Sequence, residues 1–415
     1  MSFLSVSPSK PMKSINQTLI ICILGSMFIL PGCEREIDLT PFEEKQKAGT
    51  GQSLGDTSYV EVIPPFTGFE SPTAVLVGND QIIYVADNVA NEVVMLDASG
   101  QILRRRSIPH PVALAQNSKL DLYVAAEIPD PNSNGFIGAV YRISLVRFDT
   151  TYVSRIDTII NPSTGDTSVS IVRRDTSLFY NHELEDAPMR VVWMEAGRPS
   201  RRFTGIGILP GNGYVVTRTG PDNSSFVDPD ARLLLFDKND NFITPIGDLV
   251  TRPSGGTAIT DIRDLTGIMV IPSSRDFILT QNSDGVAYGA IWMIYQNTPD
   301  FQGWVPKYDP AKAEQRAVDF IRPYRFRNAA SATYDRRRRE IFVLDSQLDS
   351  VFKFDRNGNF KNESFGRART SSSGFPHGLT QPGGIAFSND CTLYIADTGN
   401  KVVRRFRLST QTTCN

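Results

Sequence analysis

Two stretches of the sequence, 310 residues apart, follow one pattern. Near the C-terminus stands Pro382-Gly-Gly-Ile-Ala-Phe387, followed by Leu393-Tyr-Ile-Ala-Asp-Thr-Gly-Asn-Lys-Val-Val-Arg-Arg-Phe406. Much earlier stands Pro72-Thr-Ala-Val-Leu-Val77, followed by Ile83-Tyr-Val-Ala-Asp-Asn-Val-Ala-Asn-Glu-Val-Val-Met-Leu96. Each copy has three short runs rich in β-branched and aromatic residues, separated by turn-forming Gly, Asn and Asp. The chain is therefore built on an internal repeat of β-strands.

Four weaker copies lie between these two. They are Pro111-Val-Ala-Leu114 with Leu122-Tyr-Val-Ala125, Thr204-Gly-Ile-Gly-Ile208 with Gly213-Tyr-Val-Val216, Thr266-Gly-Ile-Met-Val270 with Asp276-Phe-Ile-Leu279, and Ala330-Ser-Ala-Thr333 with Ile341-Phe-Val-Leu-Asp345. The aromatic residues of the six second strands, at positions 84, 123, 214, 277, 342 and 394, are separated by 39, 91, 63, 65 and 52 residues. The 91-residue step predicts an insertion near 149–188, and a seventh repeat is the alternative.

The two strong copies resemble the NHL repeat, in which a Pro-x-Gly-Ile-Ala strand precedes a Tyr-Val-Ala-Asp strand and a third strand after Gly-Asn. This resemblance covers Tyr59 to Leu408 and implies an all-β, six-bladed β-propeller of the NHL/TolB-like type, with seven blades as the alternative. A single blade cannot bury both of its faces, so the ring must close. The last repeat ends with Val402–Leu408, and we expect the unassigned strand Tyr59–Ile63 to complete that blade.

The N-terminal region predicts export and lipidation. An apolar run, Leu19–Leu30, follows Lys10 and Lys13 and is too short to span a membrane as a helix. Leu30-Pro-Gly-Cys33 resembles the lipobox of bacterial lipoproteins. The expected organisation is a signal peptide at 1–32, a polar tether at 33–57 after lipidated Cys33, and the propeller at 58–415. The expected location is the bacterial cell envelope, lipid-anchored at the outer membrane or cell surface and extracytoplasmic, whereas a plain secreted protein with a free Cys33 is the alternative. The true start codon, Met1 or Met12, stays open.

Charge and cysteine content narrow the classes of partner. The chain has 415 residues, of which 40% are hydrophobic and 21% charged, and 43 Lys+Arg against 45 Asp+Glu give a net charge of −2. No general basic field is present to hold nucleic acid. The run Arg336–Arg339 is interpreted as a solvated hairpin tip. We expect a monomer that meets the membrane through its lipid alone. Once Cys22 has left with the signal and Cys33 carries lipid, Cys391 and Cys414 remain, and they predict one disulfide.

Aligning the six repeats places equivalent residues around one mouth of the central channel. The first ring contains Glu70, Pro109, Arg201, Arg263, Arg327 and Thr380, and the second contains Ser71, His110, Arg202, Asp264, Asn328 and Gln381. Three consecutive blades present arginine, which predicts a site for a carboxylate, phosphate or sulfate group. The alternative is that these arginines pair with nearby acids such as Asp261, Asp264 and Glu195.

Long loops are expected on the same side, at Glu127–Gly138, Arg218–Ala231 and Gln281–Ala290. The complete set of candidate ligand-binding residues is Glu70, His110, Arg201, Arg202, Arg263, Arg327, His377, Arg218, Gln281 and Tyr288.

Catalysis and metal binding have weaker support in the sequence. The three histidines, His110, His182 and His377, are too few for the zinc sites of the amidating lyases that share this architecture, and the oxygen ligands of a calcium site like that of the gluconolactonases cannot be assembled. We therefore expect no metal cofactor and name no catalytic residue. The expected function is a lipid-anchored module that binds a protein, peptide or glycan, with an anionic group at the mouth. The alternative is a lyase or hydrolase that uses His110, His377, Glu70 and an arginine there.

Overall fold

The computed structural model describes residues 58–180, 184–247, 249–251, 256–366 and 378–410. By its internal contacts the chain divides into Met1–Gln52 and Ser53–Asn415, and all described residues belong to the second unit. These residues form β-strands with three short 3-10 turns, η1 (Ala313–Gln315), η2 (Asp319–Ile321) and η3 (Thr398–Asn400). Among them, no helix has the length and apolar character needed to cross a membrane.

Six sheets of three or four strands form the blades. Blade 1 contains β2 (Pro72–Val77), β3 (Ile83–Asp87), β4 (Glu92–Leu96) and β5 (Ile102–Ser107). Blade 2 contains β6 (Ala113–Gln116), β7 (Asp121–Pro129), β8 (Phe136–Ser144) and β11 (Met189–Met194). Blade 3 contains β12 (Arg202–Ile208), β13 (Tyr214–Thr219), β14 (Arg232–Phe236) and β15 (Phe242–Pro245).

The second half of the ring repeats this order. Blade 4 contains β18 (Leu265–Val270), β19 (Phe277–Gln281), β20 (Ala290–Asn297) and β21 (Gln302–Pro306). Blade 5 contains β22 (Ala329–Asp335), β23 (Glu340–Asp345) and β24 (Ser350–Phe354). Blade 6 contains β25 (Gly384–Phe387), β26 (Leu393–Asp397), β27 (Val402–Leu408) and β1 (Tyr59–Phe66). A short parallel pair, β16 (Val250–Thr251) and β17 (Asp261–Ile262), lies between blades 3 and 4 in the sequence.

The inner strands close a circuit. Each of them contacts the inner strand of the next blade, in the order β2, β6, β12, β18, β22, β25 and back to β2. The protein is therefore a six-bladed β-propeller, as the repeat predicted, and the seven-blade alternative is wrong. The aromatic residues that set the repeat spacing are all buried between blades: Tyr84, Tyr123, Tyr214, Phe277, Phe342 and Tyr394. Their burial explains why the repeat keeps an aromatic side chain there, since removing one from a core costs about 3–5 kcal/mol.

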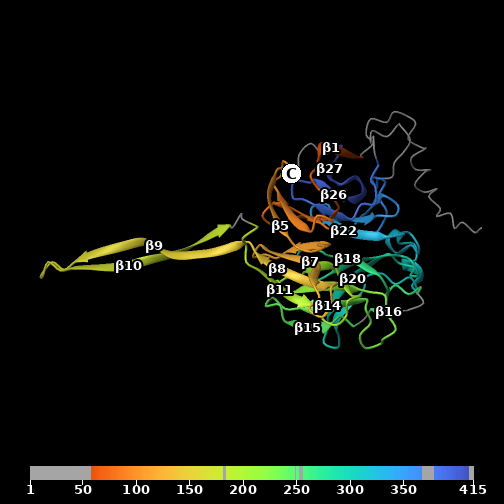
Figure 1. Cartoon of the computed structure of the whole chain (residues 1–415), viewed down its shortest axis with the longest axis horizontal. Helices are drawn as coiled ribbons and strands as arrows, with labels where there is room; N and C mark the ends of the chain where they lie inside the picture. The colour runs from red at the N-terminus through yellow and green to blue at the C-terminus, as the bar shows by residue number, and fades with distance from the viewer. Residues whose placement is uncertain (1–57, 181–183, 248, 252–255, 367–377, 411–415) are drawn as a thin grey trace, which may run out of the picture. The chain divides into compact units, whose positions relative to one another are not determined.

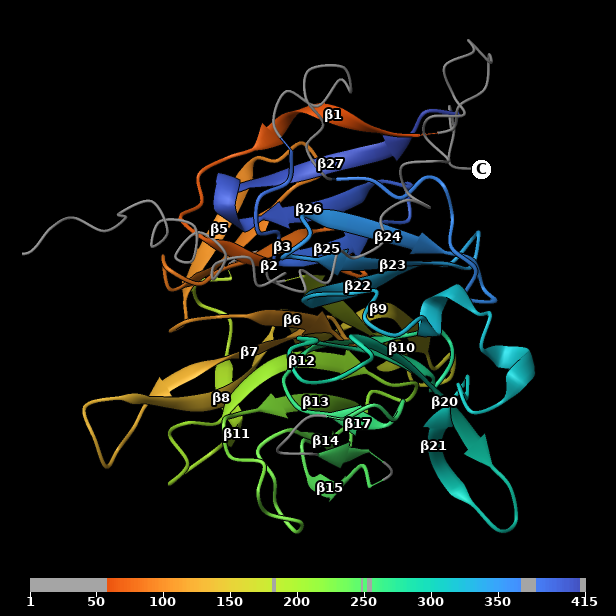
Figure 2. The same ribbon diagram turned by 90° about the vertical axis from the view of Figure 1, so that its right-hand side faces the viewer.

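The N-terminal strand completes the last blade, which confirms the predicted closure. β1 pairs antiparallel with β27, with Tyr59 opposite Leu408 and Phe66 opposite Val403. Figure 2 shows β1 lying alongside β27 as the outermost strand of blade 6. The Tyr59 ring also meets Phe342 of blade 5 edge-on, with 5.8 Å between ring centroids. The first strand of the ring thus joins blade 6 to its neighbour.

The long step in the repeat holds a β-hairpin. β9 (Val146–Ile160) and β10 (Thr167–Tyr180) pair with each other in a two-stranded sheet of their own, drawn as a separate ribbon in Figure 1. They lie in the sequence between β8 and β11, so blade 2 receives its outer strand only after the hairpin. An isolated two-stranded ribbon has little stability of its own in water.

Several sequence predictions concern residues that the structure does not describe. Cys391 is buried at the turn before β26, but Cys414 lies outside the described residues, so the disulfide stays a prediction. His182, His377 and the whole N-terminal region up to residue 57, including Cys33, lie outside them as well.

Candidate functional site

Buried aspartates define the mouth of the propeller. The Asp87 carboxylate at the end of β3 accepts hydrogen bonds from the backbone N–H groups of Glu70 (2.7 Å) and Ser71 (2.8 Å). Asp345 accepts one from Arg327 N (2.7 Å), and Asp397 accepts one from Thr380 N (2.8 Å). In these three blades the last residue of the second strand therefore holds the loop that enters its own inner strand. These loops form the mouth, at the same end of blades 1, 5 and 6.

Burial has an electrostatic cost at this position. Burial of Asp345 raises the pKa of its carboxyl group, although backbone N–H groups from Leu348, Arg327, Asn328 and Gln347 act in the opposite direction. A buried carboxylate needs such donors because it has lost the water that would otherwise solvate it. The aspartate of the repeat thus serves the architecture of the mouth.

Two of the candidate residues belong to this supporting layer. Gln281 replaces the aspartate in blade 4: its Oε1 accepts from Arg263 N (3.1 Å), and its Nε2 donates to Tyr288 O (2.7 Å) and Asp261 O (3.0 Å). The Gln281 and Tyr288 side chains are buried, and Tyr288 packs in the hydrophobic core. The structure therefore places both beneath the mouth and away from its surface.

Two arginines of blade 3 form ion pairs inside the protein. Arg201 and Arg218 are only 3% and 4% exposed. Arg201 contacts Asp230 (2.7 Å), Asp228 (2.8 Å) and Glu195 (3.2 Å), while Arg218 contacts Asp228 (2.6 Å) and Glu195 (3.1 Å). Burial alone would lower the pKa of Arg201, but the three carboxylates raise it above its ordinary value. This cluster fixes the loop at 220–231 to the start of blade 3.

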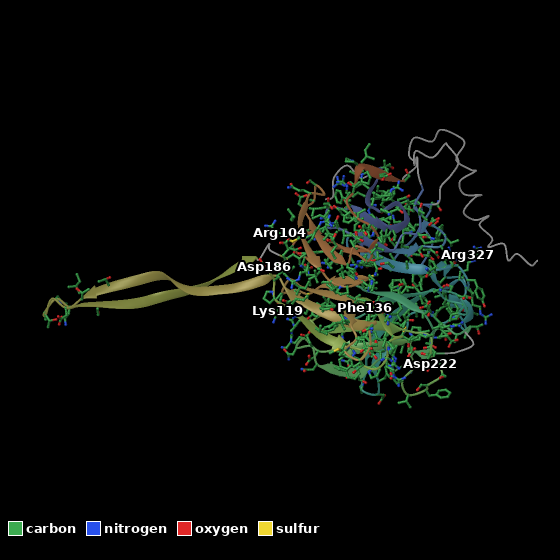
Figure 3. All side chains as sticks on the ribbon, viewed as in Figure 1. Arg104, Lys119, Phe136, Asp186, Asp222 and Arg327 are labelled. Carbon is green, nitrogen blue, oxygen red and sulfur yellow. The ribbon has the colours of Figure 1, made fainter. Side chains whose placement is uncertain are left out.

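The arginines of blades 4 and 5 have no such partners. Arg263 makes one long hydrogen bond, from its Nη1 to the backbone oxygen of Asp284 (3.4 Å). The exposed Arg327 side chain, labelled in Figure 3, has no ion pair or hydrogen bond to any described residue. Arg263 likewise has no carboxylate partner within the part of the chain that the structure describes. Two guanidinium groups are therefore available at the mouth.

One short segment connects these two arginine loops. Asn282 N donates to Asp264 O (2.9 Å) in the loop of Arg263, and Ser283 N donates to Arg327 O (3.0 Å) in the next blade. Beside them, Ser283 Oγ and Asn328 Oδ1 are buried and have no hydrogen-bond partner among the described residues. Buried polar atoms normally have one. The mouth between blades 4 and 5 thus combines available cations with unsatisfied polar atoms.

A second group of mouth residues lies at blades 2 and 3. Glu127, at the end of β7, is 2.8 Å from His110 Nδ1 through its Oε2 and pairs with Arg202 Nε through its Oε1. Phe136, also labelled in Figure 3, meets the His110 ring edge-on with 5.0 Å between ring centroids. Glu127 was not among the sequence candidates, although it begins one of the predicted long loops. It joins His110 and Arg202, which the ring alignment had placed in adjacent blades.

Two of the sequence candidates, Glu70 and His377, remain. Glu70 is exposed at the mouth of blade 1, and its backbone N–H is bonded to Asp87. His377 lies outside the described residues. Among the residues that the structure describes, no group of three or more His, Cys, Asp and Glu side chains is placed to hold a metal ion.

Comparison with known proteins supports the fold and leaves the family open. No protein-family model and no curated protein matches the chain. An auxiliary nutrient binding protein from Bacteroides ovatus is similar in structure, with 11% identity, 85% of this chain and 78% of that chain covered, and a TM-score of 0.50. A gluconolactonase from Xanthomonas campestris shows 10% identity, coverage of 85% and 90%, and a TM-score of 0.47. A virginiamycin B lyase from Staphylococcus aureus shows 11% identity, with 85% of this chain and 100% of that chain covered, and a TM-score of 0.43. At such identities the likeness concerns the propeller fold alone, and the NHL label remains a resemblance.

Proposed function

We propose that this propeller is a binding module whose mouth takes an anionic ligand between blades 4 and 5. The observation that carries the proposal is the contrast among the predicted arginines: Arg201 is neutralised by three carboxylates, whereas Arg263 and Arg327 have no carboxylate partner among the described residues. A guanidinium group pairs bidentately with a carboxylate, phosphate or sulfate. The two cations border one segment of chain, so one ligand can engage both.

The neighbouring polar atoms extend this description of the ligand. Leaving a buried donor or acceptor unpaired costs about 1–3 kcal/mol. Ser283 Oγ can donate or accept, whereas Asn328 Oδ1 only accepts. A ligand that carries hydroxyl or N–H groups beside its anionic group would satisfy both. Acidic glycans and peptides with a free carboxylate have this combination.

The test is a ligand screen followed by matched variants. Thermal stabilisation of the protein is measured at constant ionic strength against small carboxylates, phosphate esters and sulfate esters, some of them hydroxylated. Arg263→Ala and Arg327→Ala should each weaken binding of the best anion by about ten-fold or more, since a charged hydrogen bond is worth about 1.5–3 kcal/mol. Arg104→Ala, which removes an exposed arginine from outer strand β5, is the control and should bind as the unaltered protein does. Equal affinity in all four proteins would refute the proposal.

A catalytic role is the second candidate, and the His110–Glu127 pair is the observation that favours it. A carboxylate that binds one ring nitrogen orients the imidazole and leaves the other nitrogen for proton transfer. Here Glu127 binds Nδ1 and leaves Nε2 facing away from that bond. Lyase or hydrolase activity that His110→Gln abolishes, with ligand binding retained, would establish this role.

The proposed location is the cell envelope, with the chain anchored through a lipid on Cys33. The support is the sequence Leu30-Pro-Gly-Cys33 after a short apolar run. Metabolic labelling with a radioactive fatty acid tests it, because Cys33→Ser should abolish labelling and move the protein out of the membrane fraction. Labelling that survives Cys33→Ser would contradict it.

A further inference from the structure

One turn on the face opposite the mouth concentrates positive charge. β22 and β23 are joined there by the turn Arg336–Arg339, and all four arginines are exposed. The position of this turn follows from the register: Asp345, at the far end of β23, lies at the mouth, so Glu340 and the turn before it lie at the opposite end. Arg336, Arg338 and Arg339 have no ion pair to any residue within the described ranges.

The two acids nearest in sequence, Asp335 and Glu340, form no ion pair with Arg336, Arg338 or Arg339 but bind other groups of the described chain. Asp335 is buried, and its carboxylate accepts hydrogen bonds from the backbone N–H groups of Arg337 (2.8 Å) and Arg338 (3.2 Å). Glu340 is buried and pairs with Lys353 Nζ at 2.8 Å. The Asp335 carboxylate is therefore bound to the backbone of the turn and Glu340 to Lys353, and the exposed side chains of Arg336, Arg338 and Arg339 present positive charge to solvent.

The chain enters the propeller at the same face. Tyr59 begins β1 opposite Leu408, whereas Val402, at the other end of β27, pairs with the mouth residue Asp397. Tyr59 packs against Phe342, two residues into the strand that follows the arginine turn. Burial raises the pKa of the Tyr59 hydroxyl, and the positive charge of Arg338 acts against this rise, so the two side chains are within electrostatic reach. The N-terminal segment thus leaves the ring close to the arginine turn.

We infer that Arg336–Arg339 contacts the anionic lipid headgroups of the membrane to which the chain is anchored. This inference rests on the proposed lipid at Cys33. The predicted tether, residues 33–57, is 25 residues long, and a flexible polar chain of that length spans about 28 Å. The tether therefore keeps the face from which it departs near the membrane surface, where local concentration favours even a weak contact.

The chemistry of the turn fits a headgroup layer. Each arginine close to an anionic membrane strengthens binding roughly five-fold, and the effect fades within a Debye length. The four arginines belong to one exposed turn, and Arg336, Arg338 and Arg339 have no ion pair among the described residues, so the turn forms a charged tip. With the turn against lipid, the mouth and its ligand site face away from the membrane. This two-part attachment is an alternative to the untested expectation that the lipid is the only membrane contact.

The experiment measures vesicle binding without the lipid. The mature chain beginning at residue 33, with Cys33→Ser, is sedimented with vesicles of phosphatidylcholine alone or with about a third of phosphatidylglycerol, at low and physiological ionic strength. We expect binding to the anionic vesicles only, weakened by salt. The variant Arg336→Gln/Arg338→Gln/Arg339→Gln should bind about a hundred-fold more weakly, because three five-fold contributions are removed.

A charge-matched control separates this site from general electrostatics. The variant Arg104→Gln/Arg198→Gln/Arg322→Gln removes three exposed arginines at other places and should retain binding. Equal loss in both triple variants, or equal binding to neutral vesicles, would overturn the inference. Release by inorganic phosphate at constant ionic strength would also overturn it, since it would show a discrete phosphate site. Failure of fatty-acid labelling at Cys33 is a separate result and would refute only the anchor.

Discussion

Blades 3 and 4 place arginine at the same point of the repeat and use it in opposite ways. Arg201, before β12, is buried among three carboxylates, whereas Arg263, before β18, has none within the described residues. The backbone position is equivalent, so the difference arises from neighbouring loops. Asp228 and Asp230 come from the loop after β13, and Glu195 follows the outer strand of blade 2. The position of an arginine in the repeat therefore predicts where it lies in the propeller. Whether it supports the fold or is available to a ligand depends on the acidic residues around it.

The largest expected effect is on stability in blade 3. Arg201→Met should lower the free energy of unfolding by about 3–5 kcal/mol, because it leaves the buried Asp230 carboxylate without a counter-charge and takes one of two arginine partners from Glu195. Urea-induced unfolding followed by tryptophan fluorescence measures this loss. A change below about 1 kcal/mol would mean that the cluster is solvated, and the contrast between the blades would disappear.

The supporting layer beneath the mouth should give an intermediate effect. Asp345→Ala removes the acceptor for backbone N–H groups of Arg327, Asn328, Gln347 and Leu348, and should cost at least about 1–3 kcal/mol in the same assay. Ser346→Ala, one residue further along, removes only the hydroxyl that accepts from Asn328 and should cost less. The reverse order would show that the aspartates do not hold the loops.

Acid should weaken the ion pairs of blade 3. Burial would raise the pKa of Asp228, but bonds from Arg218 and Arg201 outweigh it and lower the pKa below its ordinary 3.8. The stability from these pairs is therefore complete above pH 4 and is lost as the pH falls through the depressed value. Unfolding free energies between about pH 5 and about pH 3 should fall less steeply for Asp228→Asn than for the unaltered chain. Asp284→Asn, in the equivalent loop of blade 4, serves as the control and should leave the slope unchanged.

The smallest expected effect on stability is at Arg263. Arg263→Met should change the free energy of unfolding by less than about 0.5 kcal/mol, as is usual for surface side chains. The same variant should weaken anion binding. At Arg263 the affinity for the anion therefore changes without a change in stability, whereas a substitution of Arg201 changes stability. A large loss of stability would place Arg263 with the buried cluster and remove it from the ligand site.

Features set by residues close together in the sequence were predicted well, whereas contacts between residues far apart in the sequence were predicted less well. Strand patterns and turns such as Asp355-Arg-Asn-Gly-Asn359 are local, and there the Asp355 carboxylate does accept from Asn357 N (2.8 Å) and Asn359 N (2.9 Å). Closure of the ring was predictable because the last repeat lacked a fourth strand, while the strand before the first repeat, Tyr59–Ile63, belonged to no repeat. Ion pairing was predicted only in part: Glu195 was named as an alternative partner of the mouth arginines, but Arg201 also meets Asp228 and Asp230, which lie up to 29 residues away. The role of Gln281 had a visible signal: it stands where other repeats have Asp87, Asp345 and Asp397.

The pairing of Tyr59 with Leu408 has a consequence for how the protein is made. The first strand of the ring to leave the ribosome finds its partner only when the last strand of the final blade has been synthesised. Contacts so distant in sequence slow folding, because loop-closure entropy is lost before they form. Until then the chain remains an open array of blades, and such arrays with exposed edges are prone to aggregate. Chains truncated before β27 should therefore be poorly soluble, even though most of the blades are present.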